Sequence, residues 1–195
     1  MTEQDPRAYL YRSFDQALAV VDGVTPTDLR RPTPCADFDV EALLGHLLFA
    51  ARRVARVARR LDLNDDDAVI TGISATGWSA AVNDARLDVL AGWKDDSLLT
   101  AQLELPFGTF PGAVVAGIYT LELVTHAWDL AVATGQLERL DPELAEVSLA
   151  AARQVLPPEP RGGEMPFEPV VPVADDAPSY ARLAGWLGRQ PGPEA

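Results

Sequence analysis

The sequence predicts a mainly all-α fold, and two observations support this. Four segments of the 195-residue chain carry apolar residues at mixed spacings of three and four, the repeat of an amphipathic helix: residues 3–22, 40–61, 79–93 and 111–134. Between them the sequence is rich in proline, glycine or acidic residues, which interrupt helices. With 48% hydrophobic and 23% charged residues, the chain has the composition of a globular protein.

The first two helices are bounded by local signals. Gly23 ends the first helix, and the proline-rich stretch TPTDLRRPTPCADF then carries the chain across the domain. Asp39 is the expected N-cap of the second helix, because its carboxylate can accept hydrogen bonds from the free amides of the first turn. The second helix has the clearest apolar stripe, and we interpret the arginines beside it as a solvated flank: Arg52, Arg53, Arg56, Arg59 and Arg60.

The next two helices are separated by a short extended segment. The acidic loop LNDDDA precedes the third helix, which we expect over 79–93. Residues 99–105 alternate between apolar and polar, which predicts an extended piece ending in a turn with proline and glycine. Pro111 suits the first turn of the fourth helix, and Gly135 ends that helix.

The C-terminal part is expected to be an extension of a single domain. A fifth helix over 142–156 begins after Asp141, and a short last helix covers 179–187. The stretch between them contains too much proline and glycine for a helix, with EPVVPV extended, and the tail PGPEA is expected to be frayed. The prediction is therefore one domain over 1–195, with a bundle at about 3–135 and an extension at about 136–190.

Composition excludes several classes of function. No apolar run approaches the ~20 residues of a membrane span, and the N-terminus has neither the basic start nor the apolar core of a signal peptide, so we expect a cytoplasmic protein. The net charge is −13, with 29 acidic and 16 basic residues, which argues against binding to nucleic acid or to a membrane surface. Because Cys35 is the only cysteine, a metal would be held mainly by nitrogen and oxygen.

The two histidines are the candidates for chemistry. Glu122 and His126 are four residues apart in the apolar run LELVTHAWDL, so they project from one face of the fourth helix, and His46 lies among leucines of the second helix. One interpretation is a hydrogen-bonded His–Glu pair that only satisfies itself in the core. The other is a metal site in which His46, Glu122 and His126 act as ligands from two neighbouring helices and leave positions open for water or substrate.

Three segments together resemble a known family. RPTPCADFDVEALLGHLL, LELVTHAWDLAVATG and DDAPSYARLAGWLGRQP, in this order, resemble the metal-binding DinB-like proteins related to mycothiol-dependent maleylpyruvate isomerase. The resemblance extends from about Asp28 to Pro191. It implies a four-helix up-down bundle with a metal bound by His46, Glu122 and His126. The isomerase relatives carry a sizeable C-terminal domain that contributes arginine chemistry, which the residues after Leu156 do not match, so isomerase activity is not carried over.

Other residues near these motifs have two interpretations each. Cys35 is either a reactive or ligating thiol or, more simply, a small buried residue of the proline-rich loop. Asp129 is either an acceptor that orients His126 or Trp128, or a solvent-facing residue, and Trp128 itself is interpreted as a core anchor. Arg182 and Arg189 lie in the last segment. They are either cofactor- or substrate-binding residues that hold a carboxylate, or they form structural ion pairs.

The leading functional hypothesis is a metal-dependent transferase that uses a low-molecular-weight thiol on a small electrophilic substrate. Zinc or nickel is the expected metal, because imidazole-rich sites suit both. Lys94 is the only lysine among 16 basic residues, a bias that suggests a GC-rich actinomycete genome and favours mycothiol, with bacillithiol as the other thiol considered. The alternatives are a non-catalytic protein that binds a metal or small ligand, and a metal-dependent hydrolase. A homodimer is also considered.

Overall fold

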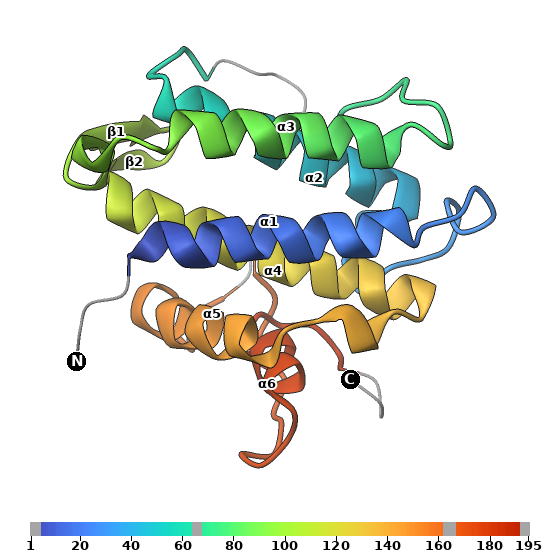
Figure 1. Cartoon of the computed structure of the whole chain (residues 1–195). Coiled ribbons are helices and arrows are strands. Elements are labelled where there is room, and N and C mark those ends of the chain that lie inside the picture. The colour runs from blue at the N-terminus through green and yellow to red at the C-terminus, as the bar shows by residue number, and fades with distance from the viewer. Residues whose placement is uncertain (1–4, 64–67, 162–166, 192–195) are drawn as a thin grey trace.

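The computed structural model describes residues 5–63, 68–161 and 167–191, and these form a helical bundle with a helical extension (Figure 1). The bundle helices are α1 (Pro6–Asp22), α2 (Val40–Ala58), α3 (Trp78–Gly92) and α4 (Gly112–Thr134). The extension contains the short 3-10 helix η2 (Leu137–Arg139) followed by α5 (Pro142–Val155) and α6 (Ser179–Trp186). The mainly all-α prediction is confirmed.

Between α3 and α4 lie a 3-10 helix, η1 (Asp96–Leu99), and the only sheet among the described residues. Strand β1 (Gln102–Leu105) pairs antiparallel with β2 (Gly108–Pro111), with Leu103 opposite Phe110. The extended piece predicted over 99–105 is therefore half of a hairpin. Helix α4 begins at Gly112, one residue after the predicted start, and Pro111 occupies the N-cap position.

The capping signals explain most helix boundaries. The carboxylate of Asp39 accepts a hydrogen bond from the amide of Ala42 at 2.9 Å, as predicted for the N-cap of α2. Gly135 ends α4 in the left-handed conformation, with φ of 70°. In contrast, α2 ends at Ala58, three residues before the predicted boundary, because Arg60 adopts a φ of 53° there. An arginine in this conformation leaves no signal in the sequence, since glycine is the usual residue at such a helix end.

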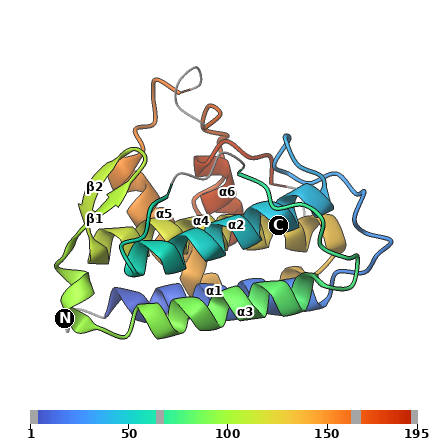
Figure 2. The ribbon, with the colours of Figure 1, turned by 90° about the horizontal axis from the view of Figure 1, so that it is seen from above.

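The four bundle helices do not simply alternate in direction. Gln136, just after α4, donates to the carbonyl of Val20 at 3.0 Å, so α1 and α4 end together and run parallel. The indole of Trp93 donates to the carbonyl of Val54 at 3.1 Å, so α2 and α3 also end together. Arg7 donates to the Trp93 carbonyl at 3.1 Å, which places the start of α1 at that same end. The order is thus up-down-down-up, and residues 68–77, the described part of the chain before α3, run beside α2 towards the start of α3 (Figure 2).

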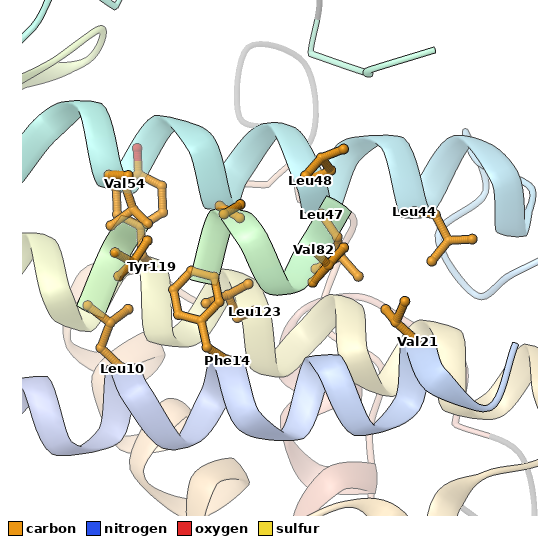
Figure 3. Close-up of a cluster of buried hydrophobic side chains, with 14 of the residues drawn as sticks. Leu10, Phe14, Val21, Leu44, Leu47, Leu48, Val54, Val82, Tyr119 and Leu123 are labelled. Atoms are coloured by element: carbon orange, nitrogen blue, oxygen red, sulfur yellow. The ribbon is translucent and has the colours of Figure 1, made fainter. Parts of the chain in front are cut away.

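Two apolar clusters share helix α4. The bundle core contains leucine, valine and aromatic side chains from all four helices, among them Leu10, Phe14, Leu47, Val82 and Leu123 (Figure 3). A second cluster joins the other side of α4 to the extension, through Trp128, Leu144, Leu149, Tyr180 and Leu183. Because both sides of α4 are covered, its sequence is apolar almost all round rather than striped.

Some predicted features lie outside the described residues or differ from expectation. Residues 3 and 4 of the predicted first helix, most of the acidic loop and most of the tail PGPEA lie outside the described residues. The stretch EPVVPV forms no strand, although the amide of Val171 donates to the carbonyl of Gly185 at 2.9 Å. Within the described ranges, no helix combines the length and apolar character needed to cross a membrane.

Candidate metal centre

The three predicted ligands meet between α2 and α4. His46 lies in the second turn of α2, and Glu122 and His126 face it from one side of α4. Nε2 of His46 lies 2.8 Å from Oε1 of Glu122, and Nε2 of His126 lies 3.5 Å from the same oxygen. The two imidazole rings meet edge to face with centroids 4.9 Å apart. Ligand atoms from all three side chains lie within 4.8 Å of one another.

The other nitrogen of each imidazole is held by an acceptor. Nδ1 of His46 lies 2.9 Å from the carbonyl oxygen of Ala68, and Nδ1 of His126 lies 3.0 Å from Oδ2 of Asp129. A carbonyl oxygen only accepts hydrogen bonds, so Nδ1 of His46 donates, and the same assignment suits His126 beside an ionised carboxylate. Each ring therefore directs Nε2 towards Glu122.

A glycine explains how the Ala68 carbonyl reaches His46. The segment that contains Ala68 and Ile70 lies against α2, and the amide of Ile70 donates to the carbonyl of Gly45 at 3.2 Å. A Cβ atom at Gly45 would lie 2.4 Å from the Ile70 carbonyl oxygen, too close for any other residue. The glycine directly before His46 thus allows the backbone approach that fixes the histidine ring.

Aromatic packing and burial give the site a closed and an open side. The ring of Phe38 stacks on His46 with centroids 5.1 Å apart, and Phe49 lies on the same helix at 6.3 Å. The His126 side chain is 8% exposed, that of His46 17% and that of Glu122 35%. Access from solvent is therefore on the Glu122 side.

The charges in the cluster are strongly coupled. Burial opposes ionisation of Glu122, but the charge of His126 and hydrogen bonds from both imidazoles outweigh it and hold the pKa of Glu122 well below its usual range. Burial also opposes the charge of His126, yet the carboxylates of Glu122 and Asp129 outweigh it and raise the pKa of His126 to about 9. Without a metal, the centre thus retains a proton near neutral pH.

The residues fit a divalent transition metal. Two imidazoles and one carboxylate are a common ligand set for zinc and related ions, which leave further positions open when only three protein ligands bind. Metal-binding histidines usually donate their second nitrogen to a carbonyl or carboxylate, and both His46 and His126 do so here. Two ligand atoms of one ion lie within about 4 Å of each other. The ligand atoms of the three side chains lie within 4.8 Å of one another, so small side-chain shifts would bring all three to bonding distance of one ion.

Comparison with known proteins assigns the family. Residues 10–131 match the family described as the mycothiol maleylpyruvate isomerase N-terminal domain. The chain belongs to this family. The matched range includes all three candidate ligands, and the DinB-like resemblance inferred from the sequence is confirmed.

Two relatives are similar to this mycothiol maleylpyruvate isomerase N-terminal domain protein over nearly its whole chain. They are the uncharacterized proteins Rv0738 and MT0763 from two strains of Mycobacterium tuberculosis. Each is 35% identical over 185 residues, covering 95% of this chain and 98% of the relative. No solved structure matches the chain significantly.

The two arginines considered for cofactor or substrate binding both form ion pairs. Arg189 donates from Nε and Nη2 to the two carboxylate oxygens of Asp129, at 2.8 and 2.9 Å. Arg182 pairs with Glu146 and donates to the Ala177 carbonyl at 3.1 Å. The structure thus gives Arg182 partners within the extension and brings Arg189 next to the metal centre.

Cys35 lies at the edge of the centre. Its sulfur, a nitrogen of His126 and a carboxylate oxygen of Asp129 lie within 4.8 Å of one another, which makes a second, overlapping group of possible ligands. The side chain is half-buried, and burial together with the charge of Asp129 raises the pKa of the thiol. Cys35 therefore has less thiolate character than an ordinary exposed cysteine.

Sequence reasoning did not identify the Ala68 carbonyl, the stacking of Phe38 or the role of Gly45. A glycine inside a strongly apolar helix was a usable signal for the last of these, since it often marks a close backbone approach. The Ala68 carbonyl leaves no trace in the sequence, because the contact uses only a backbone oxygen and every residue has one.

Proposed function

We propose that the protein is a metal-dependent transferase that joins a low-molecular-weight thiol to a small electrophilic molecule. The observation that carries the proposal is the arrangement of the two histidines. Each is anchored through Nδ1, and each directs Nε2 at the same oxygen of Glu122.

A purely structural His–Glu–His cluster explains this arrangement less well. With Nδ1 already donating, each Nε2 would need a second hydrogen to bond to Glu122, which would make both rings cationic. Two imidazolium rings with centroids 4.9 Å apart in a half-buried site repel each other. A single divalent ion satisfies both nitrogens and the carboxylate without that repulsion.

The ligand charges suit an anionic thiol. When bound, a divalent ion supplies a Lewis acid that lowers the pKa of a thiol towards neutral pH. His46 and His126 are neutral ligands and Glu122 carries one negative charge, so the loaded centre keeps one positive charge for a thiolate. Glu122 is the most exposed of the three side chains, so we propose that the thiol approaches beside it, since His126 is buried and Phe38 stacks on the ring of His46.

The family supports a thiol as the partner, since its description names mycothiol. We propose mycothiol as the first thiol to test and bacillithiol as the second, with zinc or nickel as the metal. In the transfer, sulfur forms a bond to the electrophilic carbon while a carbon–oxygen bond of an epoxide, a carbon–halogen bond of an alkyl halide or the π bond of an unsaturated carbonyl breaks. The thiol proton is taken up by the resulting alkoxide or enolate, or is released to solvent with the halide. Cytoplasmic location and a homodimer stay predictions.

The test measures thiol loss in the presence of metal-loaded protein. Zinc- and nickel-loaded samples are incubated with mycothiol or bacillithiol and a panel of epoxides, unsaturated carbonyls and alkyl halides, and conjugates are identified by mass spectrometry. We expect metal-dependent conjugate formation that survives Cys35→Ser, which removes the protein's own thiol. Metal binding without conjugate would indicate the non-catalytic alternative. Thiol-independent cleavage of added esters or amides would indicate the hydrolase.

A further inference from the structure

A buried ion pair connects the C-terminal extension to the candidate metal centre. Asp129 is fully buried on α4, and its Oδ2 accepts from Nδ1 of His126 at 3.0 Å and from Nη2 of Arg189 at 2.9 Å. Nε of Arg189 binds the other oxygen, Oδ1, at 2.8 Å. Arg189 thus holds both oxygens of the carboxylate that orients His126.

The chain after α6 is shaped to deliver this arginine. Gly188 has a φ of 83°, and the amide of Arg189 donates back to the carbonyl of Ala184 at 2.9 Å, which closes the end of α6. A Cβ at Gly188 would lie 2.5 Å from the carbonyl oxygen of Glu168. The Gly188–Arg189 pair therefore turns the chain tightly and returns the guanidinium towards α4.

The charge of Arg189 has a specific consequence for His126. A buried carboxylate needs a compensating charge, and among the described residues only His126 and Arg189 form ion pairs with Asp129. Arg189 fixes both oxygens of Asp129, and Oδ2 of that carboxylate lies 3.0 Å from Nδ1 of His126. The ring is thereby held with Nε2, the nitrogen that a metal would bind, directed towards Glu122.

We propose that Arg189 is a positioning residue of the metal centre, acting through Asp129 on His126. Arg189 lies beyond residues 10–131, the range that matches the family domain, so the extension supplies a part of the site that the matched domain lacks. This proposal rests on the proposed metal site.

The competing explanation is that Arg189 only fastens the extension to the bundle. Arg12 offers a matched control, because it also joins the two parts, through Asp141 at 2.5 Å and Glu143 at 2.8 Å, and does not contact the centre. If both arginines only fasten the extension, replacing either should change zinc affinity and the His126 ring to the same extent. If Arg189 positions His126, zinc affinity and the His126 Nδ1–H should change only when Arg189 is replaced.

The experiment compares Arg189→Met, Asp129→Asn, the double variant and Arg12→Met by zinc titration against a competing chelator. We expect each single change at Arg189 or Asp129 to weaken zinc binding about 10- to 100-fold, the range for groups that orient metal ligands. The double variant should bind zinc with about the affinity of whichever single variant binds it less tightly. The two losses should not add, because Arg189 acts on His126 only through Asp129. Arg12→Met should keep wild-type affinity. Wild-type affinity in Arg189→Met, or fully additive losses, would overturn the proposal.

Two further measurements keep the test decisive. Arg189→Gln is a milder variant, and if Arg189→Met fails to fold, wild-type zinc affinity in a folded Arg189→Gln protein overturns the proposal.

NMR of the imidazole nitrogens reports Nδ1–H of His126 directly, with only two histidines to assign. That proton should be protected in wild type and in Arg12→Met and should exchange rapidly in Arg189→Met. If wild type binds no metal, the proposed function fails, whereas an unchanged Nδ1–H signal in Arg189→Met refutes the role of Arg189.

Discussion

Two buried polar clusters, one between the bundle and the extension and one between α2 and α4 of the bundle, differ in how their hydrogen bonds are completed. In the first, the side-chain amide of Gln16 donates to the hydroxyl of Tyr180 at 2.8 Å, and its oxygen accepts from the amide of Asp141 at 2.6 Å. Every strong donor in this group meets an acceptor, and no charged side chain is needed. In the second, two imidazole nitrogens converge on one oxygen of Glu122. The first cluster is complete in itself, whereas in the second two nitrogens share one acceptor oxygen.

The comparison teaches that burial of polar residues alone does not identify a site. Gln16 and Tyr180 are each 6% exposed, as buried as His126 at 7%. What separates the clusters is the match between donors and acceptors, because a self-satisfied group contributes to stability whereas several metal-binding atoms directed at one point are typical of a ligand site.

The largest effect is expected for Glu122→Gln. The amide keeps the size of the side chain but removes the charge that offsets a divalent ion, so zinc affinity should fall by more than about 100-fold, beyond the range for orienting groups. Circular dichroism should remain that of the folded protein. Zinc titration and thermal melts with and without chelator measure this, and unchanged affinity would show that Glu122 is not a ligand.

The second prediction concerns the pH dependence of the metal-free protein. The pKa of His126 is raised from its ordinary 6.5 to about 9 in the fold, so its contribution to stability is full below pH 6.5 and is lost as pH rises through 9. The free energy of unfolding should fall by at most about 3 kcal/mol over this range. Urea denaturation of chelated protein at several pH values tests it. His126→Asn should remove most of the fall, and a flat profile in wild type would contradict the coupling.

The smallest effect is expected in the self-satisfied cluster. Gln16→Leu removes the partner of the Tyr180 hydroxyl and of the Asp141 amide, which should destabilise the fold by about 2 kcal/mol. Zinc affinity should stay at the wild-type value. Urea denaturation and zinc titration of the same samples provide both readouts, and a loss of zinc binding comparable with that of Glu122→Gln would erase the distinction between the clusters.

Much of the fold follows from local sequence signals. The third helix was predicted at 79–93 and is found at Trp78–Gly92, and Asp39 and Gly135 bound their helices as expected. The spacing of Glu122 and His126 and the apolar surroundings of His46 were sufficient to suggest that the three would meet. These features are local because they depend on helix periodicity and capping.

The remaining features depend on contacts between distant segments. The parallel pairing of α2 with α3 requires a connection long enough to return along the bundle, and no helix periodicity encodes that direction. The Ala68 carbonyl and the Asp129–Arg189 pair join segments 22 and 60 residues apart, respectively, and neither leaves a spacing that identifies its partner. Arg189 was considered for a substrate carboxylate, and the structure instead gives it a carboxylate of the protein itself.

The central claim is that one divalent ion binds between His46, Glu122 and His126. The most direct measurement is elemental analysis of protein purified without chelator, compared with the His46→Ala, His126→Ala double variant. The account predicts about one zinc or nickel ion per wild-type chain, since three ligands form a single site, and almost none in the double variant, with helical content retained in both. Equal metal content in the two proteins would contradict it.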